Sequence, residues 1–156
     1  MRNVSLALVV LFAISGRPFA GESGGEDEVT GTLQAYESAW SRHDADAIAS
    51  FYYEPAMRVG RGGPVVRPTR ADQAAFFSGF MPGLARQGYA NSTLEETNVR
   101  LLDERTALAS GITVRYKADG TVLDRLGVMY CLYKTNDGWK IFMSATHAPD
   151  AVLHFR

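Results

Sequence analysis

Apolar residues in the first third of the chain repeat with the period of a helix. Val29, Leu33, Tyr36 and Trp40 are spaced by three or four residues. This spacing predicts one buried face on a helix of about four turns.

Capping and breaking residues predict two more helices. Asp44 is placed to cap a short second helix, which Pro55 ends. Thr69 to Asp72 match a capping box that opens a third helix, and Pro82 with Gly83 interrupts it. A short strand and a glycine-rich turn are expected between the second and third helices, over residues 56–68.

The second half of the chain alternates apolar and polar residues with the period of a strand. Turn signals at Asp119-Gly120 and Asn136-Gly138 separate the alternating runs. The predicted strands span residues 97–102, 106–116, 122–133 and 139–146. Helices followed by consecutive strands predict an α+β fold with an antiparallel sheet packed on the helices.

The first twenty residues differ from the rest. A single charge, Arg2, precedes an apolar run from Val4 to Ile14, and Ala20 offers a cleavage site. We interpret residues 1–20 as a secretory signal peptide, so a periplasmic or secreted protein is expected. The alternatives are a buried N-terminal helix and an uncleaved anchor. Residues 21–28 are predicted to be a flexible lead-in, and residues 29–156 the folded domain.

Charge and histidine spacing narrow the range of partners. The formal net charge of −1 favours neither nucleic acid nor, after signal cleavage, a membrane surface. His43, His147 and His154 lack the spacing of metal ligands, so no metal and no cofactor is expected.

Two motifs resemble a known superfamily. The run from Leu33 to Tyr52, with its Ala39-Trp40 pair and Asp44 cap, resembles the opening helices of the nuclear transport factor 2-like superfamily. The run from Asn136 to Ile141 resembles that superfamily's last hairpin. The resemblance implies a SnoaL-like, cystatin-like domain. In this fold a strongly curved antiparallel sheet wraps around the N-terminal helices as a cone-shaped half-barrel. A pocket inside the cone and a homodimer formed through the sheet are also implied.

The same superfamily includes ketosteroid isomerases, whose chemistry needs a carboxylate base and two acidic donors. The resemblance places the donor tyrosine on Tyr36 and the base on Gly60, which has no side chain. The second donor falls near Val128 to Tyr130, where no acid stands. Steroid isomerisation by that mechanism is therefore not expected. The epoxide hydrolase arrangement also matches poorly, since Asp124 and Arg125 are neighbours and point to opposite faces of a strand.

Six residues are candidates for lining the pocket. Tyr36 and His147 are the candidate catalytic pair, because a histidine at the mouth of the cone is able to act as a base. This holds only if His147 shares an inward phase with Trp139 and Ile141; otherwise it is a structural histidine. The candidate ligand-binding residues are Tyr36, Trp40, Arg58, Tyr116, Tyr130 and His147.

Four arginines crowd a stretch without acidic residues: Arg58, Arg61, Arg67 and Arg70. Guanidinium groups suit carboxylates and phosphates. A solvated loop is the favoured reading of this stretch, apart from Arg58, which lies in the strand that lines the cone.

Three functions remain open from the sequence. The first is binding of a small, largely apolar molecule in the cone. The second is a lyase, isomerase or cyclase that uses Tyr36 and His147. The third is a dimeric interaction module that pairs through the outer face of the sheet.

Overall fold

The computed structural model describes residues 22–155, so the predicted signal peptide lies outside the described residues. The elements in chain order are α1 (Glu22–Ser41), α2 (Ala45–Ser50), β1 (Tyr52–Gly60), β2 (Gly63–Arg67), α3 (Arg70–Arg86), β3 (Tyr89–Leu101), β4 (Thr106–Lys117), β5 (Val122–Thr135), β6 (Gly138–His147) and the 3-10 turn η1 (Pro149–Ala151).

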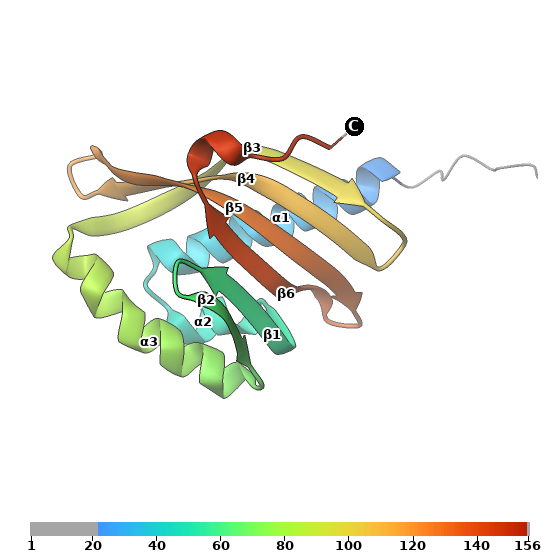
Figure 1. Ribbon diagram of the computed structural model, residues 1–156, viewed down its shortest axis with the longest axis horizontal. Coiled ribbons are helices and arrows are strands. Elements are labelled where there is room, and N and C mark those ends of the chain that lie inside the picture. The colour runs from blue at the N-terminus through green and yellow to red at the C-terminus, as the bar shows by residue number, and fades with distance from the viewer. Residues whose placement is uncertain (1–21, 156) are drawn as a thin grey trace, which may run out of the picture.

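One six-stranded sheet forms the body of the molecule, in the order β2-β1-β6-β5-β4-β3. The curved sheet lies across α1, and α3 lies beside the β1–β2 hairpin (Figure 1). The α+β half-barrel predicted from the sequence is confirmed. Its pairing is antiparallel except between β1 and β6, which run parallel. Among residues 22–155, no helix is long and apolar enough to cross a membrane.

Aromatic side chains form the centre of the core between α1, α3 and the sheet. Trp40 and Phe77 are both buried, with ring centroids 5.2 Å apart in an edge-to-face arrangement. Tyr36 contacts Tyr52 and Tyr130 in the same way, each at 5.9 Å. Such contacts add to the stabilisation from apolar burial, and they hold α1 against the concave face of the sheet.

Both predicted helix caps are present. The Asp44 side chain accepts a hydrogen bond from the Ala47 N–H at the start of α2. Thr69 and Asp72 form a reciprocal capping box at the start of α3. Each cap satisfies backbone N–H groups that have no partner within their own helix.

The predicted flexible lead-in is wrong, because α1 already begins at Glu22. Contacts with the sheet stabilise this glycine-rich turn of the helix. Glu28 forms an ion pair with Lys134 and accepts a hydrogen bond from the Trp139 indole, and Gly25 lies against Leu101. Tertiary packing therefore overrides a low local helix propensity.

Two proline-based boundaries are also wrong. The second helix ends at Ser50, and Pro55 lies inside β1. The third helix continues through Pro82 to Arg86. A proline removes one helical hydrogen bond from the carbonyl four residues earlier. That residue is the exposed Ser78, whose carbonyl is able to bond water.

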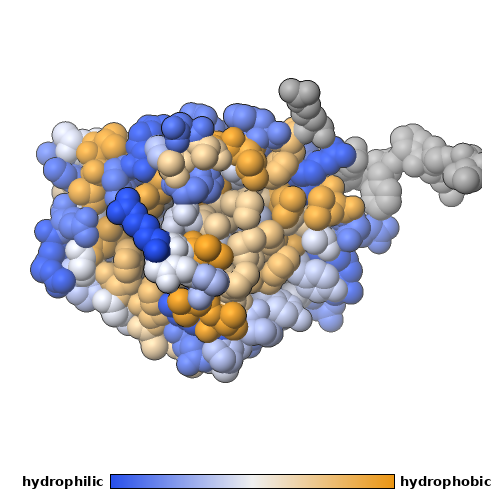
Figure 2. Space-filling view, in the orientation of Figure 1, coloured by the Kyte–Doolittle hydropathy of each residue, from blue (hydrophilic) through white to orange (hydrophobic). Residues whose placement is uncertain are grey.

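The outer face of the sheet carries a half-buried apolar area on β5 and β6. The register pairs Met129 with Ala145 and Cys131 with Met143, so the four side chains share a face. Figure 2 shows apolar residues in the middle of this face, with hydrophilic residues around its rim.

Candidate functional site

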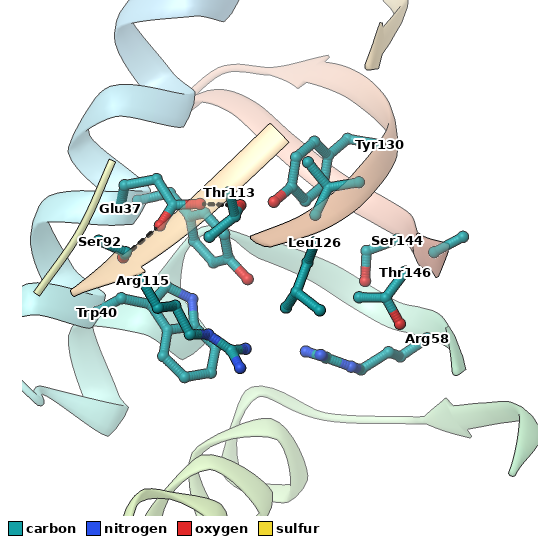
Figure 3. Close-up of a pocket in the computed structure, with 13 residues that line it drawn as sticks. Glu37, Trp40, Arg58, Ser92, Thr113, Arg115, Leu126, Tyr130, Ser144 and Thr146 are labelled. Carbon is teal, nitrogen blue, oxygen red and sulfur yellow. Dashed lines mark hydrogen bonds between the residues drawn. The ribbon is translucent and has the colours of Figure 1, made fainter. Parts of the chain in front are cut away.

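A small cavity lies between α1 and the concave face of the sheet, where the superfamily resemblance implied a pocket. Its free space is about 30 Å³, enough for a water molecule or two. Side chains from α1, β1, β3, β4, β5 and β6 line it (Figure 3). The lining is mixed: Trp40, Leu126 and Val128 are apolar, and charged or hydroxyl-bearing side chains make up most of the rest.

Glu37 brings a buried carboxyl group to this cavity from α1. It is 5% exposed. Its two oxygens accept hydrogen bonds from the Ser92 hydroxyl at 2.6 Å and the Thr113 hydroxyl at 2.9 Å, as Figure 3 shows. Burial raises the pKa of Glu37, against the opposing effects of Ser92, Thr113 and Arg115. The group is therefore poised to exchange a proton closer to neutral pH than an exposed glutamate.

Tyrosine hydroxyls form a second polar group in the cavity. The Tyr36 hydroxyl lies 2.9 Å from that of Tyr52, and Tyr52 lies 3.5 Å from the Ser144 hydroxyl. Burial raises the pKa of Tyr36 and of Tyr130 well above the usual value. Both tyrosines therefore remain protonated near neutral pH and are able to donate hydrogen bonds.

Two arginines face one another across the cavity. Arg58 on β1 and Arg115 on β4 point their guanidinium groups toward each other near Leu126 (Figure 3). Arg115 forms an ion pair with Asp124 on the neighbouring strand at 3.3 Å. Within residues 22–155, no carboxylate forms an ion pair with Arg58.

Arg58 stays charged in its half-buried position. Burial lowers the pKa of Arg58, but the surrounding hydroxyls of Tyr52, Tyr36 and Tyr130 raise it, and the net shift is upward. A buried cation without an anion is costly. This side chain is therefore the clearest sign of a ligand.

Four of the six predicted ligand-binding residues line the cavity: Tyr36, Trp40, Arg58 and Tyr130. Tyr116 does not, because its strand phase turns it to the outer face. There its hydroxyl donates a hydrogen bond to Glu95 at 3.1 Å.

His147 also lies outside the cavity, because β6 contains one extra residue. Cys131 pairs with Met143, but the next residue of β5, Leu132, pairs with Ile141. A bulge of this kind reverses which side chains face inward beyond it. The phase that Trp139 and Ile141 share with the core therefore does not extend to His147.

Beyond the bulge, Ser144 and Thr146 point into the cone (Figure 3). His147 points to the outer face, where its ring lies against Gly127 and its Nδ1 is 2.8 Å from the Ala148 carbonyl oxygen. The predicted catalytic pair of Tyr36 and His147 is therefore not formed.

Six polar lining residues are not identified from the sequence: Glu37, Ser92, Thr113, Arg115, Ser144 and Thr146. For Glu37 a signal was present, since it stands four residues after Leu33 and so on the same helix face. For the strand residues, inward phase depends on cross-strand register, which a single strand does not reveal. The acid that the resemblance implied at Gly60 is absent there, and the cavity holds its carboxyl group on α1 instead.

The chemistry of the cavity combines cations, hydroxyl donors and one protonatable acid. Such a set is suited to hold an anionic group and to move a proton beside it. No group of three or more potential metal ligands occurs within residues 22–155.

Many solved structures share this fold, and several of them do so at low sequence identity to this chain. An NTF2-like protein with a cystatin-like fold from Novosphingobium aromaticivorans superposes with a TM-score of 0.68 at 20% identity, covering 83% of this chain and 84% of that chain. An NTF2-like protein of unknown function from Pseudomonas putida gives a TM-score of 0.67 at 14% identity, covering 81% and 88%. A ketosteroid isomerase-like protein from Erwinia carotovora gives 0.54 at 16% identity, covering 80% and 97%.

These likenesses show the fold alone. No curated protein sequence is similar to this chain. A family model described as NTF2-like protein (DUF6841) matches residues 27–149. The resemblance seen in the two sequence motifs is thereby confirmed, and the chain belongs to the NTF2-like family DUF6841.

Proposed function

We propose that the cone binds a small carboxylic acid, whose carboxylate lies between Arg58 and Arg115. The observation that carries this proposal is the half-buried guanidinium of Arg58, which faces Arg115 across the cavity and has no ion pair with a carboxylate of residues 22–155. A ligand carboxylate supplies the missing charge and accepts hydrogen bonds from the guanidinium fork.

The lining also changes the expected character of the ligand. The sequence favours a largely apolar ligand, but hydroxyl groups and two arginines surround this cavity. Glu37 does not form an ion pair with either arginine, since its two oxygens accept hydrogen bonds from the Ser92 and Thr113 hydroxyls. With about 30 Å³ of free space, short acids such as formate and acetate are the first probes.

The test is a titration of the protein with acetate, in which binding is monitored by NMR through the side-chain Nε–Hε signals of ¹⁵N-labelled arginine. Arg58 and Arg115 signals are expected to shift in a saturable way, with a Kd near or above about 0.1 mM for so small a ligand. Arg58→Gln is expected to abolish the response. Arg61→Gln, an exposed neighbour on the same hairpin, is the matched control and is expected to bind as the native chain does. Equal acetate affinity in Arg58→Gln would overturn the proposal.

A second candidate function is proton transfer at the same site, with Glu37 as the base. The specific observation is a buried carboxyl of raised pKa that lines the cavity beside Arg115. Perturbed acids of this kind are common in active sites. Glu37 replaces the predicted pair of Tyr36 and His147, which the structure separates.

Pyruvate in D₂O tests this second function, since it combines a carboxylate with acidic methyl protons. Glu37 would take a methyl proton to leave the enolate, exchange that proton with D₂O and return a deuteron to the carbon. The methyl proton signal would therefore fade faster with the protein than without it. Glu37→Gln is expected to lose this exchange while still binding acetate. Exchange at the native rate in Glu37→Gln would exclude Glu37 as the base.

We also propose that the chain is exported and that two copies pair through the outer face of the sheet. Export rests on the apolar run from Val4 to Ile14, and mass spectrometry of the protein from its native cell tests for a mature chain that starts at Gly21.

Pairing of two copies rests on the apolar area around Met129 and Met143 on the outer face of the sheet. Sedimentation velocity is expected to show a dimer that Met143→Glu converts to a monomer. A monomeric native chain at micromolar concentration would contradict pairing.

A further inference from the structure

A second cavity lies between the β1–β2 hairpin and α3. Its free space is about 180 Å³, and its walls include Arg58, Val65, Arg67 and Phe76. It is separate from the cone cavity, with which it shares only Arg58. It is also smaller than a site for a drug-sized molecule, so a compact group is the fitting occupant.

The hairpin register explains why two arginines meet here. Arg58 pairs with Val65, and Ala56 pairs with Arg67. Paired residues of antiparallel strands share a face, as do residues two apart on one strand. Both guanidinium groups therefore lie on the face of the hairpin that meets Phe76. The guanidinium carbon of Arg67 is 3.8 Å from the Phe76 ring centroid, and that of Arg58 is 5.6 Å from it.

The other two arginines of the stretch do not take part. Arg61 lies exposed at the hairpin turn, and Arg70 reaches the Asp46 carbonyl oxygen from the start of α3. The sequence favours a solvated loop for this acid-free stretch. In the fold, Arg58 and Arg67 converge, while Arg61 and Arg70 lie apart from them.

The positive charges of Arg58 and Arg67 are not neutralised by a carboxylate of residues 22–155, since neither residue forms an ion pair with one. The Arg67 Nη1 is buried and has no hydrogen-bond partner among the same residues. Burial, followed by the nearby charge of Arg58, lowers the pKa of Arg67. Like charges held together with an unused buried donor favour an anion between them.

Glycines keep the cavity open at the hairpin end. Gly60, Gly62 and Gly63 form part of its wall, and a Cβ atom added at Gly62 or Gly63 would meet nothing within 4 Å. The wall is therefore bare backbone over this stretch, which leaves room for a group larger than water.

We propose that this cavity binds a phosphate group, with Arg58 and Arg67 as its two guanidinium donors. A phosphate presents enough oxygens to accept from both forks, and its double negative charge matches two unpaired cations better than a single carboxylate does. The group is either free phosphate or the phosphate of a small phosphomonoester. Arg67 lines only this outer cavity, whereas Arg58 lines both cavities, so Arg67 is the residue that tests the outer site separately from the cone.

The experiment titrates the native chain with inorganic phosphate and, separately, with phenyl phosphate, following the Arg67 Nε–Hε signal by NMR. Saturable shifts are expected from both. Tighter binding of phenyl phosphate identifies a phosphomonoester as the ligand class, and equal or weaker binding identifies free phosphate. Absence of any saturable shift with either probe would overturn the proposal.

Variants separate a specific site from general attraction to positive charge. In Arg67→Gln, phosphate binding is measured through the Arg58 Nε–Hε signal. The affinity is expected to fall about tenfold or more, because a charge-assisted hydrogen bond is lost. Arg67→Lys keeps the charge but loses the planar guanidinium. Its phosphate affinity is expected to lie between those of the native chain and Arg67→Gln. Arg61→Gln removes the same charge from the same hairpin and is expected to bind as the native chain does. Equal loss in Arg61→Gln and Arg67→Gln would overturn the site.

Acetate binding by Arg67→Gln distinguishes this inference from the proposed function of the cone. The variant is expected to bind acetate normally, which also shows that it is folded. Loss of phosphate binding with acetate binding intact supports the outer site. If the native chain does not bind acetate, the cone proposal fails, and the comparison of Arg67→Gln with Arg61→Gln still decides the outer site.

Discussion

Glu37 illustrates how much one residue depends on its surroundings in this fold. It stands on the buried face of α1, and its carboxyl is held by Ser92 and Thr113 from two strands. These hydrogen bonds favour the ionised form, yet burial outweighs them and the pKa is raised. The folded chain therefore binds this proton more tightly than the unfolded chain does.

The raised pKa predicts a pH dependence of stability. The contribution of Glu37 is fully present below its unfolded pKa of about 4.5 and is lost as the pH rises through the higher folded pKa. Glu37→Gln, which keeps the shape and resembles the protonated acid in having one acceptor oxygen and one donor group, is expected to remove this decline. Urea unfolding of both proteins between about pH 4.5 and 8 measures it. A difference in unfolding free energy that does not change with pH would show that Glu37 titrates normally.

Among the elements, β6 decides which predicted residues reach the cone. Its extra residue beside Leu132 turns Ser144 and Thr146 inward and His147 outward. Gly127 completes this arrangement, because a Cβ there would overlap the His147 ring and come within 2.5 Å of the Ala148 carbonyl oxygen. The close packing of His147 on β5 therefore requires a glycine.

Gly127→Ala is accordingly expected to destabilise the fold by about 1–3 kcal/mol, the usual cost of forcing an extra carbon into a packed site. Chemical denaturation measures the loss. Gly62→Ala, where the new carbon meets nothing within 4 Å, is the control and is expected to change stability little. A Gly127→Ala variant as stable as the control would mean that His147 moves away freely.

Local patterns predicted the elements better than they predicted the site. The helical spacing of Leu33, Tyr36 and Trp40 and the turn at Asp137-Gly138 report directly on their own segments, and both are formed as expected. The phase of His147 depends on a bulge between two strands, and the convergence of Arg58 with Arg67 depends on hairpin register. Neither relation is visible within one segment of sequence.

At the scale of the whole molecule, the sheet and α1 enclose charged and hydroxyl groups that an apolar core would exclude. The core around Trp40 and Phe77 secures the helices, while the cavity beside it holds Glu37, Arg58 and Arg115. Burying such charged groups costs stability, and a bound ligand that pairs with them offsets this cost. The central claim is therefore that the cone is an acid-binding site.

The most direct test of this claim is a crystal structure of the protein grown in acetate. Density for one acetate is expected between the guanidinium groups of Arg58 and Arg115, with its oxygens within hydrogen-bond distance of Arg58. Ordered water alone in the cavity at saturating acetate would contradict it.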